Sequence, residues 1–257
     1  MGLQKFNRTG LLTRETTYLL KNLATEIDWE QAKDKLYVSG FIPSENRNYE
    51  LYREIKRRFT QQHAFLPGLE AVSMIARSKI NQVSKAEIYL VYLYHSDVIF
   101  ATILNQVFEI RDQDKKDPII TRGTIKSLIK IYLKKNETNQ DEKTIQNWIG
   151  KFISTLKETR ILVPKKRNVY ILNASGLSAE TWTFFLMDAH FNGYSYGNAL
   201  FKEVFHVLPE EVPAIIERCN AFNWISYEIK NGNTNGNVFN YEPEYHSIAE
   251  WLSKFEK

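Results

Sequence analysis

Apolar residues recur at intervals of three and four over most of the first 111 residues of this 257-residue chain. This spacing places apolar side chains on one face of a helix, whereas a half-buried strand needs strict alternation. Few glycines or prolines interrupt the stretch, so it predicts about six amphipathic helices. The expected helices are Thr13–Thr25, Asp28–Ser39, Glu45–Gln61, Leu66–Lys79, Lys85–Tyr94 and Asp97–Glu109.

Polar side chains in this stretch are expected at helix ends and on solvated faces. Ser, Asp and Asn side chains can accept hydrogen bonds from the free N–H groups of a first turn. The residues suited to caps or first turns are Asp28, Ser44, Ser84 and Ser96. The third helix also carries a basic cluster, Arg53, Lys56, Arg57 and Arg58, which helical spacing spreads over more than one face. We expect this cluster to be a solvated helix face rather than a phosphate contact.

The middle of the chain has a different order of elements. Its charged first segment, Arg111–Pro118, has no large apolar residue and ends in proline, which predicts a linker. Two helical patterns follow, and then two short apolar runs flank a basic turn, as in a hairpin. This order predicts a winged helix-turn-helix, whose second helix lies in the DNA major groove. The expected elements are helices Thr124–Lys134 and Asp141–Thr159, strands Ile161–Val163 and Val169–Leu172, and the turn Pro164–Asn168.

The last third of the chain nearly repeats this order. Three helical patterns precede a second hairpin with a long tip rich in Gly and Asn, and a closing helix follows. The elements are helices Trp182–Phe191, Tyr196–Phe205 and Pro209–Phe222, strands Trp224–Ile229 and Val238–Tyr241, and helix Ser247–Phe255. The predicted fold is mainly α, with a helical domain over residues 1–114, a basic winged-helix unit over 115–175 and an acidic winged-helix-like unit over 176–257.

Charge is unevenly distributed along the chain, although the net charge is only +4. Residues 115–167 contain 14 Lys and Arg against 5 Asp and Glu, whereas residues 1–114 contain 15 against 14 and residues 168–257 contain 5 against 11. A basic segment in a near-neutral protein is typical of a polyanion site, and a solvated lysine-rich face is the alternative. The acidic last third should repel phosphate, so we expect a protein partner or self-association surface there.

Residues of the middle segment suit contact with DNA. On the helix Asp141–Thr159, opposite the apolar stripe, amide side chains can pair with adenine edges, lysines can reach guanine or phosphate, and Gly150 permits close approach. The basic turn lies where a wing would cross a neighbouring phosphate backbone. The candidate nucleic-acid-binding residues are Lys143, Gln146, Asn147, Lys151, Lys165, Lys166 and Arg167. The alternative is an ordinary amphipathic helix with a solvated polar face.

The sequence lacks the common catalytic and metal-binding motifs. It has no Gly-rich loop ending in Gly-Lys-Ser/Thr, no Gly-x-Gly-x-x-Gly, no His-Glu-x-x-His and no Gly-x-Ser-x-Gly. Its five histidines lack metal-ligand spacing, and its one cysteine, Cys219, can form neither an intramolecular disulfide nor a Cys-based zinc site. We therefore expect no catalysis, cofactor, metal or small-molecule substrate.

The apolar stretches of the sequence are short. None approaches the roughly 18–20 residues that cross a bilayer, and Met1–Gly10 does not resemble a secretory signal. We expect no membrane partner and a cytoplasmic location.

Several segments together carry a resemblance that extends over nearly the whole chain. They are Thr13 with Asp28–Trp29, Asn46 to Arg57–Arg58, Thr144–Trp148 with Ser154–Leu162, Trp182–Leu186, Ser195 and Phe222–Ile225. Their order, from an opening helix with an acidic-Trp step to an aromatic helix and a last winged element, resembles the BrxA accessory proteins of bacterial BREX phage-defence systems.

The resemblance implies a small non-enzymatic component that binds double-stranded DNA and acts beside a methyltransferase and other larger BREX proteins. An analogy of fold within that family also points to helical RNA-binding antitermination factors. Three alternatives therefore stay open. They are an RNA-binding antitermination-like factor, a winged-helix transcriptional regulator and a protein-interaction scaffold that binds no nucleic acid.

Overall fold

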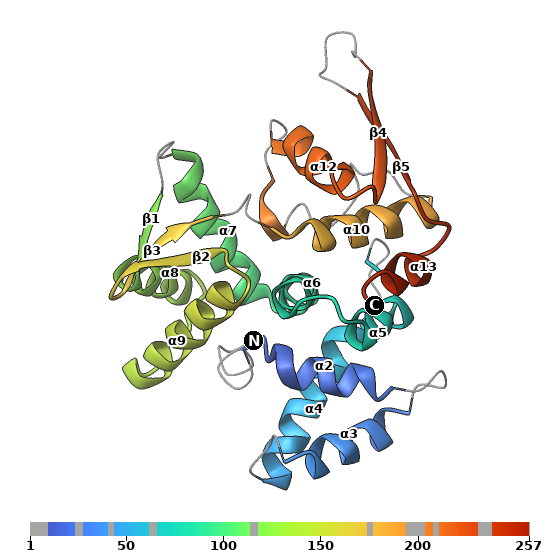
Figure 1. The fold of residues 1–257 in the computed structure, drawn as a ribbon. Helices are drawn as coiled ribbons and strands as arrows, with labels where there is room; N and C mark the ends of the chain where they lie inside the picture. The colour runs from blue at the N-terminus through green and yellow to red at the C-terminus, as the bar shows by residue number, and fades with distance from the viewer. Residues whose placement is uncertain are drawn as a thin grey trace.

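The computed structural model describes residues 10–23, 28–40, 44–61, 66–113, 118–173, 177–193, 204–207, 211–230 and 238–256. In this part of the chain the fold is mainly helical, with two small antiparallel sheets. Figure 1 shows helix α6 at the centre, with α2–α5 below it, α7–α9 and β1–β3 on one side, and α10, α12 and α13 with β4 and β5 on the other. The prediction of a mainly α fold is confirmed.

The N-terminal helices lie close to their expected positions. Their apolar stripes are buried, and α6 is buried on almost all of its faces because helices pack around it. The helices are α2 (Thr13–Lys21), α3 (Trp29–Val38), α4 (Glu45–Thr60), α5 (Leu69–Arg77), α6 (Gln82–Ser96) and α7 (Val98–Gln113). Helix α7 therefore runs into the segment expected to be a linker.

Three of the four expected capping residues lie where predicted. Asp28 and Ser44 accept hydrogen bonds from the first-turn N–H groups of α3 and α4, and Ser84 lies in the first turn of α6. The prediction for Ser96 is wrong, because Ser96 ends α6. The next residue, Asp97, caps α7 instead, and its carboxylate accepts from two backbone N–H groups at 3.0 and 3.1 Å.

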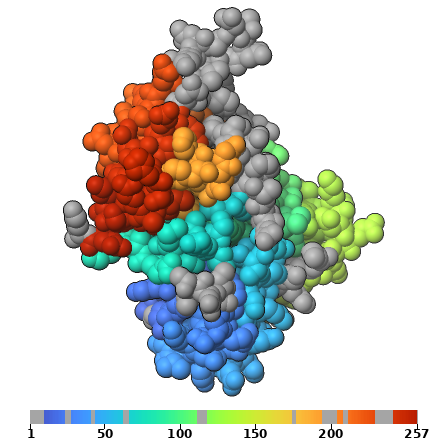
Figure 2. All heavy atoms as spheres, turned by 90° about the vertical axis from the view of Figure 1, so that its right-hand side faces the viewer, coloured from blue at the N-terminus to red at the C-terminus, as the bar shows by residue number. Residues whose placement is uncertain are grey.

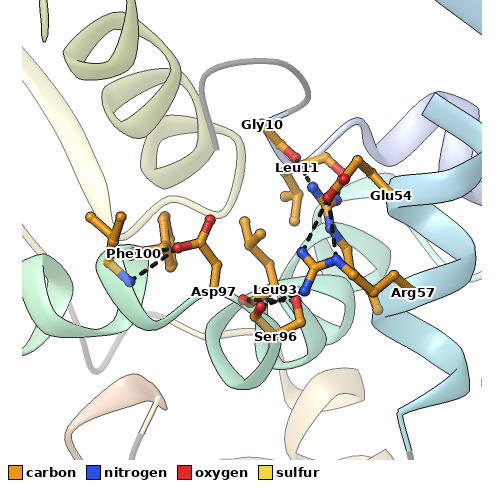
Figure 3. A network of polar contacts seen from close by, with 10 residues as sticks. Gly10, Leu11, Glu54, Arg57, Leu93, Ser96, Asp97 and Phe100 are labelled. Atoms are coloured by element: carbon orange, nitrogen blue, oxygen red, sulfur yellow. Dashed lines mark hydrogen bonds and ion pairs between the residues drawn. The ribbon is translucent and has the colours of Figure 1, made fainter. Parts of the chain in front are cut away.

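The basic cluster on α4 is only in part the solvated face that we expected, since Arg53 is exposed but Arg57 and Arg58 bond within the fold. Arg58 is 3% exposed and donates to the carbonyl oxygens of Gly10 and Leu11 at 2.7 and 3.2 Å. Arg57 donates to the carbonyl oxygen of Ser96 at 2.7 Å and to the Glu54 carboxylate at 3.1 Å. These bonds tie α4 to the end of α6 and to the residues before α2 (Figure 3). Helical spacing turns both arginines inward, where carbonyl groups need donors.

The middle region, here called the basic unit, comprises β1 (Ile119–Thr121), α8 (Arg122–Lys135), α9 (Glu142–Glu158), β2 (Leu162–Lys166) and β3 (Val169–Leu172). The two helices and the hairpin lie in the predicted order. The strands form one antiparallel sheet in the order β1-β3-β2, and β1 was not predicted. The turn between β2 and β3 contains two residues rather than five, because β2 continues to Lys166. Its second residue, Asn168, has a φ of 59°.

The apolar stripe of α9 forms the core of the basic unit, as predicted. Trp148 and Phe152 are fully buried, and the ring of Phe152 lies 5.2 Å from that of Phe100 on α7. The buried stripe comprises Ile145, Trp148, Ile149, Phe152, Ile153 and Leu156. Because this face packs inward, the opposite face of α9 is available to solvent.

The last region, here called the C-terminal unit, comprises α10 (Ala179–Phe191), α12 (Val212–Asn220), β4 (Ile225–Lys230), β5 (Val238–Pro243) and α13 (Ile248–Ser253). Strands β4 and β5 pair as the expected antiparallel hairpin. Most of the expected helix Tyr196–Phe205 lies outside the described residues. The cysteine, Cys219, is a buried core residue of α12, where burial raises the pKa of its thiol to about 11.

The three regions share one continuous cluster of buried apolar residues. Helix α10 packs against α6, and α13 packs against α5. Lys79 Nζ also donates to the carbonyl oxygen of Glu256 at 2.8 Å. Figure 2 shows the resulting contact, with the C-terminal segment in red lying against the cyan part of the chain.

A helix that crosses a bilayer must be both long and apolar along its length. Among the described helices, none alone is long and apolar enough to cross a bilayer. The pair Gln82–Ser96 and Val98–Ile110 would satisfy length and composition together, but it bends by 113°.

Candidate nucleic-acid interface

The exposed face of α9 carries the candidate residues in one line. Asp141 caps the helix by accepting from Thr144 N at 2.8 Å, which fixes where the first turn begins. Lys143, Asn147 and Lys151 are exposed and are spaced by four, so they follow one another along the helix surface. Two cations and an amide are thus presented on the side of the helix opposite its buried stripe.

A surface groove of about 750 Å³ runs beside this line and reaches two other helices. Its lining contains three cations, two amides and a hydroxyl, and no carboxylate. The lining residues are Arg47, Arg122, Gln146, Asn147, Gly150, Lys151 and Ser154. Here it is called the α4–α9 groove. It brings three predicted residues together and adds two arginines, one from α4 and one from the start of α8, that sequence analysis did not assign to the site.

Gln146 is held by a chain of polar contacts. Its Oε1 accepts from Arg122 Nη2 at 2.9 Å, and its carbonyl oxygen accepts from the same Nη2 at 3.0 Å. Its Nε2 donates to Glu142 Oε1 at 2.8 Å. Both ends of the amide are therefore engaged within the protein. Gln146 orients Arg122, and a bidentate contact to adenine would require it to give up its bonds to Arg122 and Glu142.

Glu142, which does not line the groove, completes this chain. Lys126 Nζ lies 2.5 Å from Glu142 Oε1. The hydrogen bond from Lys126, followed by that from Gln146, lowers the pKa of the Glu142 carboxyl, which therefore stays ionised at neutral pH. An acceptor at this position fixes which end of the Gln146 amide faces Arg122.

The basic end of the hairpin lies next to the same arginine. Lys165 and Lys166 at the end of β2 and Arg167 in the turn are all exposed. Arg122 N donates to the carbonyl oxygen of Asn168 at 3.1 Å, so the turn is attached to the start of α8. Arg122 thus contacts the turn through its backbone and α9 through its side chain. The hairpin turn and the polar face of α9, distant in sequence, belong to one surface.

Sequence patterns explain which residues were missed. Arg122 lies two residues before the expected start of its helix, whose real start is set by the Thr121 and Thr124 capping box. Arg122 belongs to the basic segment 115–167, so the uneven charge distribution of the sequence already indicated a role for it. Arg47 lies in the near-neutral N-terminal region, where no local pattern distinguishes it from other charged residues on a helix.

The described residues contain no group of three or more His, Cys, Asp and Glu side chains arranged to hold a metal ion. Comparison of the chain with family models, with curated proteins and with solved structures gives no match. Function is therefore inferred from the residues and from the geometry of this surface.

Proposed function

We propose that this chain is a non-enzymatic protein that binds double-stranded DNA through the basic unit. The observation that carries the proposal is the set of exposed cations on the outer face of α9, in the lining of the α4–α9 groove and at the end of the β2–β3 hairpin. A surface with several cations and no carboxylate in its groove suits the phosphates of a nucleic acid.

The order of elements supports a winged helix-turn-helix. Helices α8 and α9 form the helix pair, and β2 and β3 form a hairpin that lies beside it in a sheet with β1. In such folds the second helix of the pair enters the major groove and the hairpin contacts the adjacent backbone. In this proposal the exposed polar line on α9 and the basic end of the hairpin take those two roles.

The contacts favour recognition of the backbone over recognition of bases. Gln146 is committed to Arg122 and Glu142, so Asn147 is the one predicted amide whose side chain has no hydrogen-bond partner among the described residues. Lysine and arginine contacts to phosphate give affinity without sequence information. We therefore propose a largely sequence-independent DNA-binding protein.

The proposed biological setting rests on the resemblance to BrxA accessory proteins. On that resemblance, the chain would bind DNA beside a methyltransferase and other larger proteins of a phage-defence system. The C-terminal unit lies in the acidic region of the chain and is the surface we assign to a protein partner.

A binding titration tests the proposed function directly. Fluorescence anisotropy of the full chain with a labelled duplex, single-stranded DNA and a looped RNA, each at two salt concentrations, should show preferred binding to the duplex. The affinity should fall steeply as salt rises, because phosphate contacts release counterions.

Other outcomes of this titration would replace the proposal. Preference for looped RNA would favour an antitermination-like factor. Strong discrimination between unrelated duplexes would favour a transcriptional regulator. Absence of binding to all three at low salt would leave a protein-interaction scaffold.

A further inference from the structure

We propose that the α4–α9 groove binds a backbone phosphate of the DNA, held by Arg47, Arg122 and Lys151. This inference rests on the proposed function and extends it. The DNA-binding surface then crosses from the basic unit onto α4, in a region whose sequence is nearly neutral.

Arg122 is organised for this task before any ligand binds. Its Nε and Nη2 are held by Gln146, whereas Nη1 has no hydrogen-bond partner in the described part of the chain. A guanidinium fixed along one edge keeps donors for a phosphate oxygen and loses little side-chain freedom on binding. Arg122 also lines the groove, so these donors are within the site.

Gly150 leaves room for the phosphate. It lies in the middle of α9, and a Cβ built at this position would meet no atom within 4 Å. Glycine lowers helix stability here, and packing gives no reason for its small size. In a groove lined by cations, the missing side chain allows a bulky anion to approach the helix backbone.

The two walls of the groove are fixed relative to each other. The bonds from Arg57 to Ser96 and from Arg58 to Gly10 anchor α4 to α6 and to the residues before α2 (Figure 3). Gly10 in turn packs against α9, since a Cβ there would lie 3.6 Å from Lys151 Cδ. Arg47 is therefore carried on a helix with a defined position relative to Lys151. Its Nη1 also pairs with Glu50 Oε2 at 3.2 Å on the same helix, and a phosphate in the groove would share the guanidinium with that carboxylate.

Three substitutions test the groove, and one matched substitution controls for charge. Arg47→Gln and Arg122→Gln remove one cation each, and Gly150→Glu adds a carboxylate where there is space for it. Arg53→Gln removes an exposed cation from α4 outside the groove. Duplex affinity is measured by anisotropy at two salt concentrations, and a thermal melt of each variant verifies folding. Gly150→Glu should fold at least as well as the parent because it replaces a mid-helix glycine.

We expect Arg47→Gln and Arg122→Gln each to weaken binding about three- to tenfold on unrelated duplexes and to reduce the salt slope by roughly 0.9. Gly150→Glu should weaken it more, and Arg53→Gln should bind like the parent. If the parent binds duplex but all three groove variants bind like Arg53→Gln, the groove assignment is wrong and the proposed function stands. If Arg47→Gln is the one groove variant that keeps the affinity of the parent, α4 does not contact the DNA. If the parent binds no duplex, the proposed function itself fails.

Discussion

The basic unit and the C-terminal unit share an order of helices followed by a hairpin, yet they present different surfaces. The first lies in a segment with 14 basic and 5 acidic residues, and the second in a segment with 5 basic and 11 acidic residues. Helix α9 exposes Lys143, Asn147 and Lys151, whereas α12 exposes Glu217 and Arg218. The same order of elements can therefore present helix faces of different charge.

The two units also differ in how they are built into the protein. Helix α10 is buried over most of its length and packs against α6, α12, α13 and β5. In the basic unit one whole face of α9 remains exposed beside a groove. In the basic unit the second helix has an exposed face beside a groove, whereas in the C-terminal unit the first helix is buried in the core.

The largest expected effect is common to both units. Trp148→Ala in α9 and Trp182→Ala in α10 should each lower the free energy of unfolding by about 3–5 kcal/mol, because each empties an aromatic site in the core. Chemical denaturation followed by circular dichroism measures this. If Trp148→Ala leaves the free energy of unfolding unchanged but abolishes DNA binding, Trp148 contacts the DNA. The two tryptophans would then not be equivalent core residues.

A pH-dependent effect should distinguish the C-terminal unit. Glu87 on α6 is fully buried, and its Oε2 accepts from Ser178 Oγ at 2.5 Å and from Thr181 Oγ1 at 2.6 Å at the start of α10. Burial raises the pKa of its carboxyl above 4.5, so the folded state holds this proton more tightly than the unfolded state. Its contribution to stability is full below pH 4.5 and is lost as the pH rises through the raised pKa.

Glu87→Gln isolates that contribution. The parent should lose stability relative to the variant as the pH is raised from 4.5 towards neutral, by up to about 1.4 kcal/mol per unit of pKa shift. Urea titrations of both proteins at stepped pH measure the difference. A constant difference over this range would mean that the carboxyl is not perturbed. Duplex affinity at neutral pH should be the same for both proteins.

A smaller effect should show that Gln146 acts through Arg122. Gln146→Ala should weaken duplex binding by about as much as Arg122→Gln, and the double variant should add little, because both changes disturb one contact. Anisotropy with two unrelated duplexes measures all three. Additive losses, confined to one duplex, would instead show that Gln146 contacts bases directly.

The smallest expected effect concerns Asn147. Asn147→Ala should change the free energy of unfolding by less than about 0.5 kcal/mol, since the side chain is exposed and is not a cap. Binding should weaken slightly and equally on unrelated duplexes. A loss of about 1–3 kcal/mol on preferred sites only would show base recognition and would favour a transcriptional regulator.

The predictable part of the fold is the part encoded in local patterns. The stripe from Ile145 to Leu156 fixes the buried face of α9, and side-chain chemistry places the caps at Asp28 and Ser44. Strand β1 has only three residues, Ile119–Thr121, which is too short for a detectable alternation. It forms because β3 offers a free edge.

The candidate site was only partly predictable for a similar reason. Lys151 and Asn147 follow from helical periodicity, and the basic turn follows from its composition. The engagement of Gln146 with Arg122 and the approach of Arg47 to α9 depend on tertiary packing. The sequence pattern of a single segment cannot predict which residues of other segments it will contact in the folded chain.

The central claim is that the basic unit, and not its C-terminal counterpart, binds the DNA backbone. The most direct test compares the salt dependence of duplex binding for the parent, for the triple variant Lys165→Glu, Lys166→Glu and Arg167→Glu, and for Glu217→Lys in α12. The triple variant should bind every duplex more weakly, and its salt slope should be smaller by roughly 0.9 for each lost phosphate contact. Glu217→Lys should match the parent. A triple variant with the affinity and salt slope of the parent would contradict the account.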